Sequence, residues 1–392
     1  MARSSPRRRA EPARKRRRRR TTGDAARPLA EGSETALPGT APVPPPPPSS
    51  RAGTRALFLL WVLVVLLGAA LLVVGLFGTG PLATDRLDLP AGLRPIDLDS
   101  PLLPEIGSVL VGTAYVWALA ARTGGRPAVF SLLTAVVGAL VLWADRDLMR
   151  NGAAVMLCVV SAVLAIVATV PAVKLWQAVR EVVVAVAVAA LGGLATVGLH
   201  PTIDVVRFEY VTFGLSLAAS FGVVYRLGAG LHGLGKRGIV TVVFGGVVLV
   251  LSLVYAELLR RYGTPFLVEW LFDAVRWLRA ELGASPRPIV ALLGIPALVW
   301  GTHMRARRRQ GWWVCAFGVG ATAPIAQALT DLGMTRQESA TALGYALVVG
   351  LVLGALLIRL DLALTGQRGR GGRRAEEAAA IRPEPARFEP LL

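Results

Sequence analysis

The sequence predicts an all-α fold, a polytopic integral membrane helix bundle of about ten transmembrane helices. Three observations predict it. Apolar residues make up 54% of the 392-residue chain and charged residues only 17%, and the mean hydropathy is +0.56. Apolar runs of roughly 15 to 23 residues, close to the ~20 needed to cross a bilayer, recur from Ala56 to Ile358. Each run should be a helix, because only a segment that satisfies its own backbone hydrogen bonds is stable in lipid.

Residues 1–55 are predicted to be a disordered, basic and proline-rich cytoplasmic tail. They carry two arginine-rich clusters, Arg7–Arg9 and Arg14–Arg20, and the run Pro44–Pro48, with hardly any large apolar residue. Such a composition cannot bury a core, and the prolines favour a stiff polyproline II spacer. The first apolar run, 56–78, lacks a convincing small-residue cleavage site, so it is interpreted as a retained span and not as a removed signal.

The transmembrane bundle is predicted over residues 56–361, followed by a second disordered cytoplasmic tail at 362–392. Nine further apolar runs follow the first span. They cover residues 106–121, 127–144, 152–173, 182–199, 210–225, 239–258, 288–302, 312–330 and 340–358.

The distribution of charge predicts that both ends of the chain are cytoplasmic. With that orientation the inner loops carry eleven cations against a single acid, Glu181. The outer loops carry eleven cations against fourteen acids, and five of those cations belong to one long segment, 259–287. Long segments translocate largely regardless of charge, so the cation count favours the inner side without them. The inner cations are Arg122, Arg126, Lys174, Arg180, Arg226, Lys236, Arg237, Arg305, Arg307, Arg308 and Arg309.

Part of the long outer segment is predicted to form an interfacial helix over residues 265–282. Thr264 can cap it, Pro265 suits its first position and Gly283 can end it. Most of its residues are apolar, with two tryptophans, while Glu269, Asp273 and Arg276 fall on one narrow stripe. This pattern is typical of a helix that lies flat on the outer leaflet.

Small residues spaced four apart predict close packing between helices within the chain. In lipid the hydrophobic effect does not hold helices together, so close backbone approach along such stripes supplies the contact. Association of two chains along the same stripes is the alternative. The stripes are Ala185, Ala189 and Gly193; Gly214, Ala218 and Gly222; and Ala342, Ala346, Gly350 and Gly354.

Candidate catalytic residues are Asp97 and Asp99, which flank Leu98 in the first outer loop. An acid in this place could act as a general base on the hydroxyl of a lipid-linked substrate. Membrane glycosyltransferases that use lipid-phosphate sugar donors place an essential Asp there, and the analogy concerns placement alone. A solvated acidic loop is the competing interpretation, and no family motif surrounds the two residues.

Candidate substrate-binding residues are His200, Glu209, Glu257 and Asp331 at the outer ends of the spans, and Gln327, the most polar residue well inside a span. A turn or helix cap at His200–Asp204 and a helix-to-helix hydrogen bond of Gln327 are the competing structural interpretations. No ionisable residue is found at mid-span, which disfavours a proton- or sodium-coupled carrier.

No metal and no cofactor are predicted. Cys158 and Cys315 lie inside apolar runs, and the three histidines lie in separate elements, so no ligand spacing exists. The expected partners are membrane lipids, with anionic lipid at the N-terminal arginine clusters. Nucleic acid is not expected, because no aromatic residue is interleaved for stacking.

Three functions remain open. The first is a transport or envelope-associated protein that moves or presents a small or lipidic substrate. The second is an enzyme acting on lipid-linked substrates at the outer leaflet, and the third is a non-catalytic assembly factor. Only three of the 43 basic residues are lysines, and Ala, Gly, Val and Leu dominate. This composition is typical of high-GC genomes, so a bacterial plasma membrane is the expected location.

Overall fold

The fold was obtained as a computed structural model. It describes residues 51–77, 102–227, 287–308, 310–330, 336–365 and 384–391, with scattered positions between 243 and 284 and residues 375 and 378. Every regular element in these parts is helical. Eight of the described helices are long and apolar enough to cross a membrane, and a shorter apolar helix covers Ile289–Arg305. The predicted helical membrane bundle is therefore confirmed.

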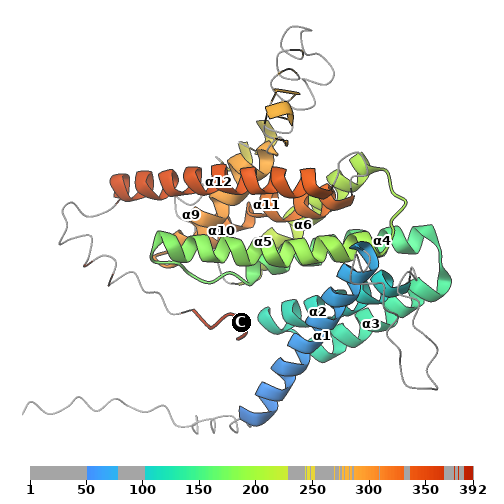
Figure 1. The fold of residues 1–392 in the computed structure, drawn as a ribbon. Coiled ribbons are helices and arrows are strands. Elements are labelled where there is room, and N and C mark those ends of the chain that lie inside the picture. Colours follow the sequence, from blue (N-terminus) through green and yellow to red (C-terminus); the bar gives the residue numbers. More distant parts are fainter. Residues whose placement is uncertain are drawn as a thin grey trace, which may run out of the picture. The chain divides into compact units, whose positions relative to one another are not determined.

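Short connections join α2 to α3, α3 to α4, α4 to α5 and α5 to α6 (Figure 1). The first six are α1 (Arg51–Phe77), α2 (Leu102–Arg122), α3 (Pro127–Ala144), α4 (Asp147–Val167), α5 (Leu175–Gly198) and α6 (Val205–Arg226). The later ones are the π-helical turn η3 (Ile289–Gly294), α9 (Ile295–Arg305), α10 (Gly311–Ala316), α11 (Val319–Thr330) and α12 (Arg336–Thr365).

Local sequence signals set several helix ends where the sequence predicts them. Proline occupies the first position of α3, where its missing N–H has no helical partner to lose. Asp145 ends that helix in the left-handed conformation, with φ of 44°, and its N–H bonds to the carbonyl of Val141. Asp204 caps α6, because its side chain accepts a hydrogen bond from the Arg207 N–H at 3.0 Å.

The fourth span begins and ends earlier than predicted. The apolar run continues to Val173, but α4 ends at Val167 and residues 168–174 are irregular. Pro171 explains the difference, because a proline ring inside a helix clashes with the carbonyl four residues earlier, which belongs to Val167. The irregular segment that results lies beside the end of α9, where the Ala172 N–H bonds to the Thr302 carbonyl.

Several predicted segments lie mainly outside the described residues. They are the span at 239–258, the interfacial helix at 265–282, most of the tail at 1–55 and residues 366–383 of the second tail, apart from the scattered positions named above. The structure does not test the predictions for these segments.

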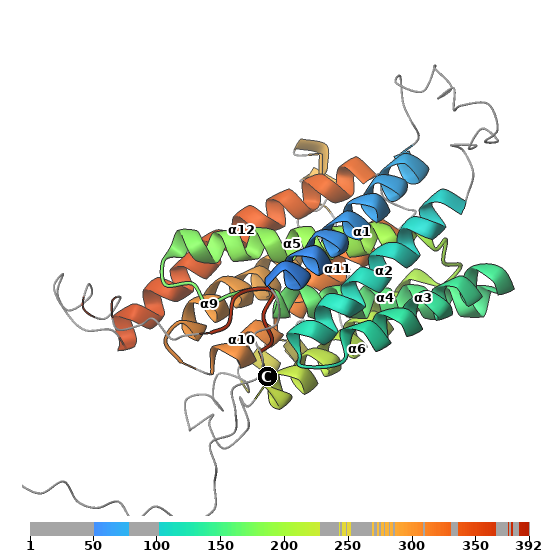
Figure 2. The ribbon, with the colours of Figure 1, turned by 90° about the horizontal axis from the view of Figure 1, so that it is seen from below.

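Helices α5 and α11 lie at the centre of the described bundle. Figures 1 and 2 show α12 on one side of α5 and α2 and α3 on the other, and α11 contacts α4, α5, α6, η3 and α12. The segment Gly311–Thr330 is the most deeply buried of the candidate spans, whereas α1 and α3 are mostly exposed. Exposed apolar faces on the outer helices are expected where lipid is the solvent.

The two halves of the central hairpin, η3–α9 and α10–α11, approach each other through glycines. A methyl group on Gly294 would lie 2.0 Å from the backbone nitrogen of Ala321, and one on Gly301 would lie 2.7 Å from the Cys315 sulfur. Both helices are also interrupted. A π-helical turn precedes Pro296 in the first, and residues 317–318 break the second.

The small-residue stripes of α5 and α12 pack within the chain as predicted, whereas the two glycines of the α6 stripe meet none of the described residues. Gly193 meets α11 at Ala326, and Gly350 meets Ile295. In α6, by contrast, no described atom lies within 4 Å of a methyl group placed on Gly214 or Gly222. The buried face of α6 instead follows Phe208, Thr212, Ser216, Ser220 and Val224. Hydroxyl side chains can line such a face because they bond to their own helix, as Thr212 does to the Phe208 carbonyl at 2.6 Å.

Candidate functional site

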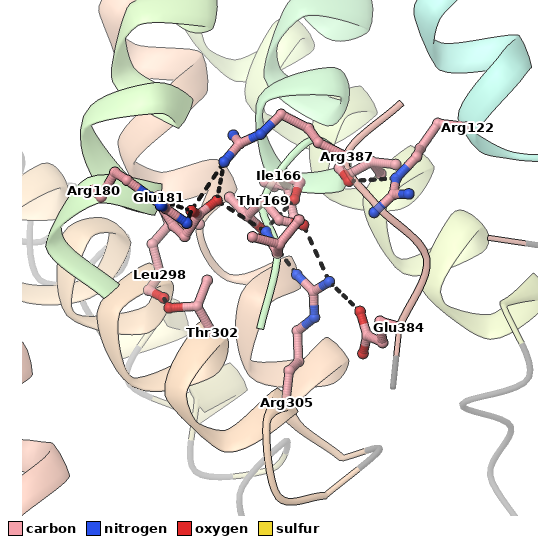
Figure 3. A network of polar contacts seen from close by, with 12 residues as sticks. Arg122, Ile166, Thr169, Arg180, Glu181, Leu298, Thr302, Arg305, Glu384 and Arg387 are labelled. Carbon is pink, nitrogen blue, oxygen red and sulfur yellow. Dashed lines mark hydrogen bonds and ion pairs between the residues drawn. The ribbon is translucent and has the colours of Figure 1, made fainter. Parts of the chain in front are cut away.

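Three charged side chains that the sequence places in solvated inner loops are buried together at one end of the bundle. Arg122 ends α2, Glu181 lies near the start of α5 and Arg305 ends α9. Their exposed fractions are 2%, 0% and 0%. Figure 3 shows all three in one polar network, which we call the arginine site. Burying a charge is costly unless it is paired, so each of these residues needs identified partners.

Arg305 has the most complete set of contacts. Its Nη1 donates to the Thr169 hydroxyl at 2.7 Å, and its Nη2 donates to the Thr169 carbonyl at 3.1 Å. The same Nη2 lies 2.6 Å from a carboxylate oxygen of Glu384, near the end of the chain. One face of the guanidinium lies over the Trp312 ring, with 3.4 Å between the guanidinium carbon and the ring centre. The side chain is therefore held by contacts with three separate parts of the chain.

The irregular segment 168–174 positions Arg305. It runs beside the end of α9, where the Ala172 N–H bonds to the Thr302 carbonyl at 3.0 Å. The Ala172 carbonyl lies 3.1 Å from Nδ1 of His303. Because Pro171 ends α4 early, the polar backbone of this segment is available to an arginine. The local sequence thus creates acceptors at a depth where a continuous helix would offer none.

Glu181 collects donors from three parts of the chain. The Val170 N–H bonds to it at 3.0 Å. Arg180 bonds to one carboxylate oxygen at 2.9 Å, and Arg387 donates to both oxygens at 2.9 and 2.7 Å. The acid is therefore saturated by cations and does not face Arg305 directly.

Arg122 binds backbone carbonyls instead of acids. Its Nη1 donates to the carbonyls of Ala386 and Glu389, both at 2.5 Å. Its Nε donates to the Val167 carbonyl at 3.4 Å, one of the carbonyls left without a helical partner where α4 ends. The carbonyl of Arg122 in turn accepts from the Leu391 N–H at 2.8 Å.

The 384–391 segment, comprising residues Glu384 to Leu391, forms the outer wall of the arginine site. It was assigned to a disordered tail from its sequence, and the structure departs from that expectation for these eight residues. Phe388 packs against α1, with its ring centre 4.9 Å from that of Phe58 and 5.7 Å from that of Trp61. Glu384 is 6% exposed at the side chain, so the segment inserts a carboxylate into the bundle.

A cavity of about 760 Å³ opens between this segment and the bundle. Its bundle wall is mainly apolar, and charged side chains of Arg180, Arg387 and Glu384 reach it. A second, smaller cavity of about 130 Å³ lies on the α1 side of Phe388, among Trp61, Tyr115 and Leu164. Space therefore remains beside the segment on both sides.

No protein-family model, curated protein or solved structure matches this chain. Any functional conclusion therefore rests on the geometry of the chain itself.

The opposite end of the bundle carries the described part of the sequence-predicted candidates. His200 adopts a positive φ of 49° at the end of α5, and its Nδ1 lies 3.9 Å from the carboxylate of Glu105. Glu105 is 5% exposed at the side chain and pairs with Arg150 at 2.5 Å. Arg150 also pairs with Asp145, at 2.7 Å. This network joins the ends of α2, α3, α4 and α5.

Glu209 and Gln327 meet where α6 crosses α11. The Gln327 amide donates to the Glu209 carbonyl and to the Thr212 hydroxyl, both at 3.0 Å, which confirms the predicted helix-to-helix hydrogen bond. The Glu209 carboxylate lies 3.6 Å from Arg287. Asp97, Asp99, Glu257 and Asp331 lie outside the described residues. Within the described parts of the chain, no cluster of three His, Cys, Asp or Glu side chains could hold a metal ion.

Sequence reasoning missed the arginine site. One signal of a buried charge was present in the sequence. Glu181 is the single acid in the predicted inner loops, which also carry eleven cations. A second was the pair of acids Glu384 and Glu389 within an apolar stretch that follows the arginines of the second tail. Neither signal says which cations the acids meet.

Proposed function

We propose that this protein transports or presents an anionic substrate in a bacterial plasma membrane, and that it binds this substrate at Arg305 and Arg122. The observation that carries the proposal is the burial of these two arginines beside a cavity, with the carboxylate of Glu384 placed on one of them.

Without the 384–391 segment, the described arginines of the arginine site outnumber its acids. The bundle itself supplies three described arginines, Arg122, Arg180 and Arg305, and one acid. That acid, Glu181, pairs with its neighbour Arg180. Arg122 and Arg305 then have no carboxylate from the described helices, only backbone carbonyls, the Thr169 hydroxyl and the Trp312 ring. Two buried cations without a counter-charge favour an anion.

The central hairpin supports transport as the use of this site. Arg305 ends the interrupted helix η3–α9, and π-helical turns are frequent at functional sites. Discontinuous helices in membrane transporters often carry substrate sites. A change in the close crossing at Gly294 would move the helix that carries Arg305.

The orientation that we propose places the arginine site on the cytoplasmic side, with both ends of the chain. Residues assigned to inner loops, such as Arg122, Arg180 and Arg305, gather at one end of the described bundle, and Glu105 and Asp145 gather at the other. The basic clusters of the N-terminal tail are proposed to contact anionic lipid on the same side.

The enzyme hypothesis rests on Asp97 and Asp99 and stays a prediction. The assembly-factor hypothesis likewise stays open, and deletion of residues 1–50 is its test.

Equilibrium binding of two radiolabelled probes to the purified full-length protein tests the proposal. The probes are inorganic phosphate and dihexanoyl phosphatidic acid. We expect Arg305→Gln to weaken binding at least about tenfold, because a charge-assisted hydrogen bond to a buried anion is lost. Arg305→Lys keeps the charge and should retain part of the affinity. Arg308→Gln, on the same loop at a partly exposed position, is the matched control.

Uptake of the bound probe into proteoliposomes then separates transport from presentation. Equal binding by the wild-type protein and by folded Arg305→Gln would overturn the proposal. So would failure of both probes to bind the wild-type protein and a full-length Glu384→Gln variant.

A further inference from the structure

We infer that the 384–391 segment is an internal competitor that occupies the ligand's place in the arginine site, and that the ligand is an amphiphile joining an anionic group to an apolar one. The inference rests on the proposed anion site and adds the class of ligand and the control of access.

The segment itself has both halves of such a ligand. Its acidic half is Glu384, which pairs with Arg305. Its apolar half is Phe388, which packs on the aromatic rings of Phe58 and Trp61 in α1. A molecule that replaces the segment must satisfy the same arginine and cover the same apolar surface.

The pairing of Glu384 with Arg305 is incomplete. The carboxylate uses Nη2 of the arginine, while the arginine Nε and the second carboxylate oxygen are buried with no hydrogen-bond partner among the described residues. Nη2 of Arg122 is likewise buried with no hydrogen-bond partner among the described residues. Arginine binds carboxylate and phosphate most strongly when two parallel N–H groups are used. An anion free to choose its own position can use donors that Glu384 leaves unpaired.

The apolar half of the site is also incompletely filled. The cavity of about 760 Å³ beside the segment is bordered by Val170, Pro171, Val173 and Val184. A typical small-molecule site has a volume of roughly 300 to 1,000 Å³ and a mainly apolar lining. The segment therefore occupies the charged part of a site whose apolar part can accept a larger group.

Two sources could supply the shared chemistry of an anion beside an apolar group. One is a membrane lipid with a phosphate headgroup, which could enter from the side of α1, and the other is a soluble organic anion. Dihexanoyl phosphatidic acid carries both halves, inorganic phosphate carries only the anion, and dihexanoylglycerol carries only the apolar half.

A reversible lock on the segment tests the inference in the full-length protein. The variant Phe58→Cys/Phe388→Cys is joined by a disulfide-containing bis-maleimide, and the native Cys158 and Cys315 are buried. We expect the locked protein to bind dihexanoyl phosphatidic acid at least about tenfold more weakly than the same protein after reductive cleavage. The single variant Phe388→Cys, treated with the same reagent, is the matched control.

Removal of the competing charge should act in the opposite direction. Full-length Glu384→Gln is expected to bind the probe about tenfold more tightly than wild type if the segment fills the site nine times in ten. A synthetic peptide of residues 384–392 should then compete with the probe, and the same peptide with Glu384→Gln should compete more weakly.

The outcomes separate the two proposals. Equal binding before and after cleavage of the lock overturns the inference, while the proposed anion site stands. Binding of inorganic phosphate as tight as that of dihexanoyl phosphatidic acid overturns the amphiphile as ligand. If no anionic probe binds the unlocked protein or the Glu384→Gln protein, the proposed function is overturned. The result of the peptide competition does not change that conclusion.

Discussion

The guanidinium carbon of Arg305 lies over the Trp312 ring, 3.4 Å from the ring centre. The two residues face each other across the short turn between α9 and α10, and both are buried. With its carbon over the ring, the guanidinium directs its N–H groups to Thr169 and Glu384. Trp312 therefore fixes the direction in which the arginine can bind an anion.

Trp312→Leu is expected to weaken binding of dihexanoyl phosphatidic acid. A desolvated cation–π contact contributes about 2 kcal/mol, which corresponds to roughly thirtyfold in affinity. The adjacent Trp313 packs on Phe221, with 5.7 Å between ring centres. Trp313→Leu is therefore the control, and it should lower the melting temperature without a comparable loss of binding. Equal losses of affinity in both variants would show that the stack has no special role.

Gly294→Ala is expected to disrupt the central hairpin. The added methyl group would lie 2.0 Å from the Ala321 backbone nitrogen, and backbone cannot move aside as a flexible side chain can. Overpacking costs typically 1–3 kcal/mol, so the variant should unfold at markedly lower temperature in detergent. Gly222→Ala, with open space around the added group among described atoms, should be neutral or stabilising by up to about 1 kcal/mol. A lower melting temperature for Gly222→Ala than for Gly294→Ala would refute the close backbone crossing at Gly294.

Arg150→Gln is expected to destabilise the end of the bundle opposite the arginine site. The change leaves Glu105, 5% exposed at the side chain, without its cation, and breaking one side of a buried pair costs roughly 3–5 kcal/mol. The other acid that pairs with Arg150 is Asp145, and the Asp145 side chain is 75% exposed. Asp145→Asn should therefore lower the free energy of unfolding by less than about 1 kcal/mol. Thermal unfolding in detergent compares them, and similar losses would contradict the assignment of the buried pair.

Cysteine labelling in intact cells should distinguish the two ends of the bundle. The native cysteines are buried, so an introduced thiol gives the main signal. With the proposed orientation, Arg146→Cys, at an exposed position between α3 and α4, reacts with a membrane-impermeant maleimide. Arg308→Cys reacts only after the cells are permeabilised. The reverse pattern would place the arginine site outside the cell.

The sequence was sufficient for features whose cause is local. Pro127, Asp145 and Asp204 fix helix ends through interactions within a few residues. The two ends of α3 coincide with the predicted span at 127–144, whereas α6 begins at Val205, five residues before the predicted start of its span. The sequence also indicated that Gln327 bonds to another helix, because a polar amide inside a span needs a partner. The structure shows that this helix is α6. These predictions required no knowledge of how distant segments meet.

The arginine site could not be predicted because its contacts are long-range. Arg305 and Glu384 are 79 residues apart, and Arg387 and Glu181 are 206 apart. A charge at the end of a span is normally solvated, so nothing local marks Arg305 as buried. The buried face of α6 was not predicted for another reason. Small residues predict close approach, yet among the described residues the hydroxyl-bearing face that includes Thr212 is the buried one.

The competitor and its site belong to one polypeptide, joined through α12 and residues 366–383. A tethered group meets its target at a local concentration that is fixed by the tether. Dilution or overexpression of the protein leaves this value unchanged. The threshold at which the ligand displaces the segment is therefore independent of copy number, and each molecule in the membrane would respond to ligand abundance alone.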